Sequence, residues 1–216
     1  MVAYAFLARG AVEPLSGFAW PTPAETRRGA WVNADSVPRE ALRGYPSGDL
    51  PYWLDDELWR IELVGKLAER DHLLLAERAR LAGRIDAWAD PVAWEFVAAC
   101  ARRIAVPAAV ALREEGRAHA AARLEGAGDL GELEQAAAAA ADLRGSRAQL
   151  AGYLADVCFY SRDAGIPARA AGVAAKMSAH ALAADAADAR AHDAVLARER
   201  AWQAGWLVER LGLSAH

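Results

Sequence analysis

The chain has 216 residues, enough for one large domain or two small domains with hydrophobic cores. Hydrophobic residues make up 55% of it and charged residues 25%, proportions that are typical of a globular protein. The net charge is −4, so the protein has no excess of positive charge to attract the phosphate backbone of a nucleic acid. We therefore expect no nucleic-acid partner.

Residues 1–88 contain nearly all of the predicted strands and turns. Val2–Leu7 mixes aromatic and aliphatic residues and predicts a first strand, and Ala30–Asn33 predicts a short second one. Prolines and glycines in Gly17–Pro23 and Pro38–Pro51 predict loops, because proline fixes φ and lacks the amide hydrogen that regular structure needs. These segments predict a small antiparallel β unit.

The clearest strand is predicted at residues 57–64, where apolar and polar residues alternate. Successive strand side chains point to opposite faces, so Arg60 and Glu62 share the face opposite the apolar residues. The apolar face consists of Trp59, Ile61 and Leu63. We expect Val64–Lys66, with a glycine at its centre, to be the turn that closes the strand.

Residues 67–86 fit two patterns. One set of residues fits one face of a helix: Leu74, Leu81, Ile85 and Trp88. Another set alternates as in a strand: Leu73 and Leu75, then Leu81, Gly83 and Ile85. We favour two strands, because the preceding turn allows a returning partner strand and Gly83 weakens a helix. A helix stays the alternative.

Three aromatic segments of the N-terminal part carry a resemblance. They are Ser-Gly-Phe-Ala-Trp-Pro at 16–21, Leu-Pro-Tyr-Trp-Leu at 50–54 and Glu-Leu-Trp-Arg-Ile-Glu-Leu at 57–63. This part of the chain resembles the N-terminal part of uncharacterised actinobacterial proteins. The chain has only two lysines beside abundant arginine and alanine, and this composition is similar to that of proteins encoded by high-GC genes. The resemblance implies a bacterial, non-secreted protein and brings no activity with it.

From Asp90 onward the sequence is rich in alanine and helical in pattern. Asp90 is a suitable N-cap, and a proline follows at the first helical position, so a first helix begins there. Pro107 is predicted to begin a second helix, which ends before Gly126. Asp129–Glu132 resembles a capping box and begins a third helix, which contains the six alanines Ala136–Ala141.

The C-terminal third of the chain predicts three more helices. Ser146–Gln149 is a capping box for a fourth helix, which reaches about Asp163. Pro167 begins a fifth helix, and Asp188–Arg190 separates it from a sixth that ends at Leu211. The pattern therefore predicts a bundle of about six helices.

These elements predict an α+β protein with two parts. A small tryptophan-rich antiparallel β unit at residues 1–88 precedes an alanine-rich helical bundle at residues 89–216. Six of the eight tryptophans lie before residue 95, and the other two lie on the last predicted helix. We therefore expect the two parts to share an interface, where pockets form preferentially.

The chain contains no motif for a metal or a cofactor, and we expect neither. Cys100 and Cys158 form no Cys-x-x-Cys pair, and the five histidines form neither His-x3-His nor His-Glu-x-x-His. A P-loop, Gly-x-Gly-x-x-Gly and Gly-x-Ser-x-Gly are also absent from the sequence. The first ten residues lack a signal peptide, and no apolar run approaches the length of a membrane span. We therefore expect a cytoplasmic protein with free thiols and no membrane partner.

The first candidate site is a cavity between the two predicted parts. A carboxylate among aromatic rings is desolvated, which raises its pKa and lets it transfer protons near neutral pH. Glu62 and Glu199 are the candidate catalytic carboxylates; the alternative for Glu199 is an ion pair with Arg198 or Arg200. The acidic run Asp55–Glu57 is a related candidate, with a solvated turn as its alternative. The aromatic substrate-binding walls would be Trp53, Trp59, Trp202 and Trp206.

The second candidate site lies on the fourth predicted helix, where Tyr153, Asp156 and Tyr160 share a face. Two phenols beside a candidate catalytic carboxylate could bind a polar substrate or act as acid and base; the alternative is the outer face of an amphipathic helix. On the fifth helix, Lys176 and His180 are one turn apart and could bind a phosphate or a carboxylate. Their alternative is an ordinary surface pair.

These features support two hypotheses about function. The first is a cofactor-independent enzyme of bacterial specialised metabolism that acts on a small organic molecule by carboxylate-assisted proton transfer or intramolecular ring closure. The second is a non-catalytic module that binds a small molecule, or whose helical bundle binds a protein partner or a second copy of the chain. A pocket lined by tryptophan and carboxylates would favour the first, and a large exposed apolar helical face the second.

Overall fold

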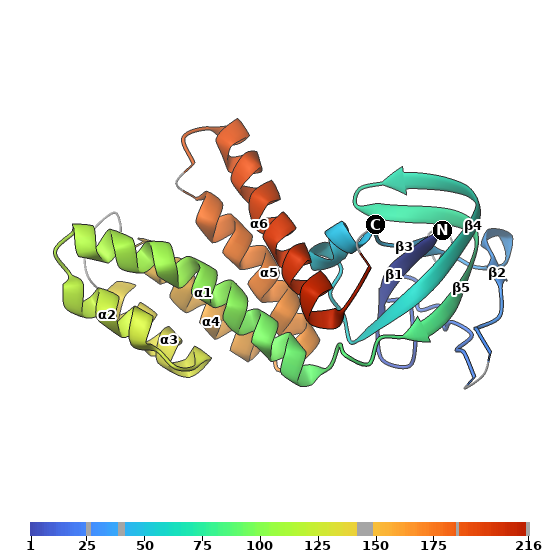
Figure 1. Cartoon of the computed structure of the whole chain (residues 1–216), viewed down its shortest axis with the longest axis horizontal. Coiled ribbons are helices and arrows are strands. Elements are labelled where there is room, and N and C mark those ends of the chain that lie inside the picture. Colours follow the sequence, from blue (N-terminus) through green and yellow to red (C-terminus); the bar gives the residue numbers. More distant parts are fainter. Residues whose placement is uncertain (25–26, 39–41, 142–148, 185, 215–216) are drawn as a thin grey trace. The chain divides into compact units, whose positions relative to one another are not determined.

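The computed structural model describes residues 1–24, 27–38, 42–141, 149–184 and 186–214 (Figure 1). These residues form an antiparallel sheet followed by α-helices, which confirms the predicted α+β fold. The chain divides into two compact units. We call Met1–Val92 with Ala204–His216 the sheet unit, and Ala93–Gln203 the helical unit. The last turns of the final helix thus belong to the sheet unit, whereas the predicted bundle includes them.

The sheet has five antiparallel strands in the described residues, in the order β1-β4-β5-β2, with β3 also paired to β5. Their bounds are Val2–Leu7 for β1, Val32–Asn33 for β2, Arg43–Gly44 for β3, Glu57–Arg70 for β4 and Leu73–Arg84 for β5. The predicted first and second strands are therefore confirmed. The predicted loop at 38–51 is wrong in part, because β3 lies within it. A 3₁₀ helix at Ser47–Tyr52 also begins within it and ends one residue beyond it.

The alternation predicted for β4 is confirmed. Its apolar face lies in the core of the sheet unit, while Arg60 is exposed and Glu62 half-buried on the other face. Ile61 pairs across the sheet with Leu81 of β5, and Leu63 pairs with Ala79. Burial of one face is what makes this register specific, since a shift of one residue would turn the core residues outward.

The turn predicted at Val64–Lys66 is wrong, because β4 continues through Gly65 as a β-bulge. Gly65 has φ of +87°, and a Cβ there would collide with the side chain of Glu77. The chain reverses instead at Asp71 and His72, which both have positive φ, as a two-residue hairpin turn requires. The returning strand β5 confirms strands rather than a helix for residues 67–84.

Six α-helices follow in the described residues, as predicted. Their bounds are Asp90–Glu114 for α1, Ala118–Gly126 for α2, Leu130–Ala141 for α3, Gln149–Asp163 for α4, Pro167–Ala183 for α5 and Ala189–Leu211 for α6. The predicted capping box that opens the fourth helix at Ser146 lies outside the described residues, which resume at Gln149.

The predicted helix start at Pro107 is wrong, because α1 runs through this proline. The helix ends instead at Glu114, and Gly116 just beyond it has a φ of +77°, which suits glycine. The amide of Gly116 donates to Arg113 O at 2.9 Å, and the amide of Arg117 donates to Leu112 O at 2.8 Å. This pair of hydrogen bonds is a Schellman motif, which satisfies carbonyl groups that the helix end leaves without partners.

In the helical unit, α3 lies against α2 and α4, and α4 lies against α5. Small buried residues line these contacts, including Ala136, Ala137 and Ala140 on α3. On α5 they include Ala170, Ala171, Ala174 and Ala175. Small side chains let helix backbones approach closely, so the alanine-rich sequence produces tightly spaced helices. Within the described ranges, no helix combines the length and apolar character needed to cross a membrane.

Candidate functional site

The acidic run before β4 holds a neighbouring loop. Glu57 accepts hydrogen bonds from the amides of Gly10 at 3.2 Å and Ala11 at 3.0 Å, and from Trp59 Nε1 at 3.1 Å. Asp56 accepts one from the amide of Arg9 at 3.3 Å. Ala11 has a positive φ of 58°, a costly conformation for a residue other than glycine. These carboxylates therefore help to stabilise a strained turn.

Glu62 is ion-paired within the sheet unit. Its partners are Arg28 and Arg80, and Arg80 Nη2 lies 2.6 Å from the carboxylate. Arg60, which lies two residues away on the same face of β4, is exposed. Both oxygens of Glu62 thus have arginine partners.

Glu199 is ion-paired within the helical unit. Its side chain is 2% exposed and accepts from Arg103 Nη2 at 2.8 Å and Arg103 Nε at 3.2 Å. The arginine belongs to α1 and also lies over the ring of Trp202, 4.8 Å from its centroid. An ion pair with Arg198 or Arg200 is one of the two alternatives predicted for Glu199; the pair that the structure shows is with Arg103, 96 residues away.

The four tryptophans predicted as aromatic walls are distributed between the two units. Trp59 is buried in the sheet core, and Trp53 stacks on Tyr45 with ring centroids 4.8 Å apart. Trp202 lies in the helical unit under Arg103, and Trp206 is half-buried near the end of α6. A cavity shared by these four rings stays a prediction.

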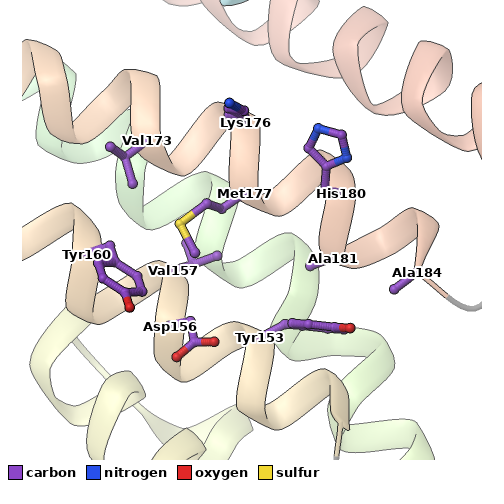
Figure 2. A pocket seen from close by; sticks show the side chains of 10 residues that line it. All are labelled: Tyr153, Asp156, Val157, Tyr160, Val173, Lys176, Met177, His180, Ala181 and Ala184. Carbon is purple, nitrogen blue, oxygen red and sulfur yellow. The ribbon is translucent and has the colours of Figure 1, made fainter.

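The second predicted site is a pocket between α4 and α5, with a volume of about 580 Å³. Tyr153, Asp156 and Tyr160 of α4 line one side of it, and Lys176 and His180 of α5 line the other (Figure 2). The sequence points to these two groups separately, and the structure brings them together. The shared face predicted for the three α4 residues is thus the wall of a concave site.

The floor of this pocket is apolar. Figure 2 shows Met177 of α5 extending between the helices toward Val157 of α4. Val173 and Ala181 continue the floor along α5, one turn to either side of Met177. The three α5 residues of the floor are not among the candidates predicted from the sequence, although their spacing of four is the signal of one helical face. The floor can exclude water from the apolar part of a ligand.

The polar groups on the rim are open to a ligand. Gln149 Nε2 donates to the Tyr153 hydroxyl at 2.6 Å, which leaves the hydroxyl hydrogen able to donate further. Within the described chain, neither an ion pair nor a hydrogen bond engages the side chains of Asp156, Lys176 and His180. Glu57, Glu62 and Glu199, by contrast, are all held by protein partners.

His180 lies in a positive environment. Burial, and then the charges of Arg200, His192 and Lys176, hold the pKa of His180 below its ordinary value of 6.5. The His192 ring on α6 lies 6.1 Å from the His180 ring. The His180 imidazole is therefore neutral at pH 7, and an anion that binds beside it would favour its protonation.

The cysteines and the acidic residues give no metal centre in the described part of the chain, where no three potential ligands lie together. Cys100 and Cys158 are free and buried. Burial raises the pKa of each thiol to about 12, so both are protonated and unreactive at neutral pH.

The pocket between α4 and α5 thus joins an apolar floor to polar groups, among them Asp156, Lys176 and His180, which have no ion-pair or hydrogen-bond partner in the described residues. Comparison of the chain with protein-family models, with curated proteins and with solved structures found no match.

Proposed function

We propose that this protein binds a small organic molecule, with an apolar body and a charged group, in the pocket between α4 and α5. One observation carries the proposal: Asp156, Lys176 and His180, without ion-pair or hydrogen-bond partners in the described residues, lie around an apolar floor. The volume of about 580 Å³ lies within the roughly 300–1,000 Å³ of small-molecule sites. The apolar body would lie on Met177 and Val157, and an anionic group would lie beside Lys176 and His180.

The setting we propose is a bacterial cytoplasm, as the sequence resemblance implies. The two free, buried cysteines support a reducing compartment, because thiols there stay unpaired.

The proposal is tested by the two methionines of the chain, Met1 and Met177. Protein labelled with ¹³C at the methionine methyl groups has one signal in the pocket floor and one at the N-terminus. We expect octanoate and 3-phenylpropionate, each an anion with an apolar body, to shift the Met177 methyl signal in a saturable way. The Met1 signal should not move. A Met177 signal that stays in place with both compounds at millimolar concentration would contradict the proposed function.

Lys176→Met should weaken octanoate binding about fivefold, because it removes the cation and keeps most of the side-chain length. Lys66 of β4 is the other lysine of the chain and provides the matched control. Lys66→Met removes the same charge outside the pocket and should leave the affinity unchanged. Equal losses in the two variants would show that only the net charge of the protein matters.

The affinity for octanoate should rise as the pH falls from 8 to 5.5. The lowered pKa of His180 places its protonation below pH 6.5, and the charged imidazole then attracts the carboxylate. The neighbouring groups are Lys176 on the same helix, His192 and Arg200 on α6, and Tyr153 and Asp156 on α4.

We expect an increase of about threefold over this range, measured by titration calorimetry. His180→Gln should abolish the increase, whereas His192→Gln should retain most of it. A pH dependence that survives His180→Gln would assign the protonation to another group.

Proton-transfer catalysis without a cofactor is the second candidate function, either by simple proton exchange or in an intramolecular ring closure of bacterial specialised metabolism. It is favoured by the neutral His180 imidazole, which can accept a proton, opposite the phenols of Tyr153 and Tyr160 and the carboxylate of Asp156. Deuterium from solvent that appears in a bound compound, and that His180→Gln abolishes, would distinguish catalysis from binding.

A further inference from the structure

The charged groups of the α4–α5 pocket are divided between its two walls. The α5 wall is cationic, with Lys176 and His180, and Arg200 of α6 adds positive charge beside His180. The α4 wall has the carboxylate of Asp156 between the phenols of Tyr153 and Tyr160 (Figure 2). The two walls therefore recognise opposite charges.

These opposite charges do not neutralise each other. Asp156 and Lys176 are both described residues that line the same pocket, yet no ion pair joins them. The apolar floor of Met177 and Val157 lies between the two walls. A purely anionic ligand would satisfy Lys176 and be repelled by Asp156, and a purely cationic ligand would do the reverse. A ligand with both charges satisfies both walls.

The apolar floor limits how the two charges are arranged in the ligand. Met177 and Val157 lie between the charged groups of the two walls, so two charges joined through an apolar segment match the walls better than two charges on one carbon atom. Two extended residues span about 7 Å, so the termini of a dipeptide are separated in this way. Apolar side chains of such a peptide would cover the floor.

Resting on the proposed function, we infer that the ligand is a short apolar peptide with both termini free, of about two residues. Its carboxylate binds Lys176 and His180, and its ammonium group binds Asp156. The hydroxyl hydrogen of Tyr153 donates to the peptide carbonyl, since the hydroxyl oxygen already accepts from Gln149. Specificity then comes from two charges at a defined separation over an apolar surface.

The test uses four related peptides and the full-length protein at pH 7. They are Leu-Leu, N-acetyl-Leu-Leu, Leu-Leu amide and N-acetyl-Leu-Leu amide. They share the apolar body, and they differ only in which terminal charges are present. Titration calorimetry and the Met177 methyl signal report affinity and place of binding. We expect Leu-Leu to bind about fivefold more tightly than each singly blocked peptide, and the doubly blocked peptide to bind weakest.

Two variants assign each terminus to its wall. In Asp156→Asn, acetylation of the N-terminus should no longer reduce the affinity, while amidation of the C-terminus should still do so. In Lys176→Met, the effect of amidation should shrink, and the effect of acetylation should stay. Reciprocal losses of this kind cannot come from a general change of stability, because the affinity of each variant for a blocked peptide is compared with the affinity of the same variant for Leu-Leu.

The outcomes separate the inference from the proposed function. If the four peptides bind equally, or only bind when the ammonium group is blocked, the peptide inference is wrong. If octanoate shifts the Met177 signal and Leu-Leu does not, the pocket binds small anions and the inference fails alone. If neither compound shifts it, the proposed function and the inference fail together.

Discussion

Replacing Arg43 by methionine should lower the free energy of unfolding of the sheet unit by about 3–5 kcal/mol. Arg43 on β3 is 5% exposed and forms an ion pair with Glu13, which is 2% exposed. The guanidinium also lies over the ring of Trp53, 5.4 Å from its centroid. Without the arginine, the Glu13 carboxylate is a buried charge with no cation beside it, which is costly.

The environment of Glu13 makes the effect specific. Its carboxylate also accepts from the amide of Leu15 at 3.0 Å and from the hydroxyl of Ser16 at 2.6 Å, so the loop geometry keeps it in place. The carboxylate therefore cannot easily turn to solvent in the variant. Hydrogen exchange of the β4 and β5 amides measures the loss, since core strands exchange only through large openings.

Two further variants test the explanation. Glu13→Gln in the Arg43→Met background should recover part of the loss, because a neutral amide is cheaper to bury than a carboxylate. Arg60→Met removes an exposed arginine from β4 and should change the stability by less than about 0.5 kcal/mol. If Arg43→Met and Arg60→Met have similar effects, the buried pair does not determine the stability of the sheet unit.

Ala137→Leu should destabilise the helical unit by about 1–3 kcal/mol. Ala137 on α3 is completely buried, and α3 lies against α2 and α4. Leucine has three more side-chain carbon atoms than alanine, and the close contact between the helices leaves no room for them. The helices must therefore separate, or the side chain must leave its preferred rotamer.

The next residue of the same alanine run provides the control. Ala138 is exposed, and leucine has nearly the helix propensity of alanine, so Ala138→Leu should change the stability by less than about 0.5 kcal/mol. Hydrogen exchange of the α3 and α4 amides compares the two variants. An Ala138→Leu variant as unstable as Ala137→Leu would contradict the face assigned to α3.

The sequence alone predicts the elements whose signal is local. The alternation of β4 shows which residues enter the core, because strand geometry turns successive side chains to opposite faces. Six helices are also predicted, because capping residues and prolines act within one turn of the helix end. The division of the fold into sheet and helices follows from the same local signals.

Local signals also explain the two errors of boundary. Gly65 is interpreted as a turn, but its positive φ serves a bulge inside β4. Pro107 is interpreted as a helix start, but α1 tolerates it and ends at Glu114, before Gly116. Proline and glycine permit several structures, and packing in the tertiary structure selects one.

Only the tertiary structure decides the partners of the acidic residues and the composition of the candidate site. Glu199 pairs with an arginine 96 residues away, and Glu62 pairs with arginines 34 and 18 residues away. The α4 and α5 groups of the pocket are each visible in the sequence as a helical face. That they line one pocket depends on α4 packing against α5, with Met177 between them. A sequence shows which side chains share a face, but which faces meet is determined by long-range packing.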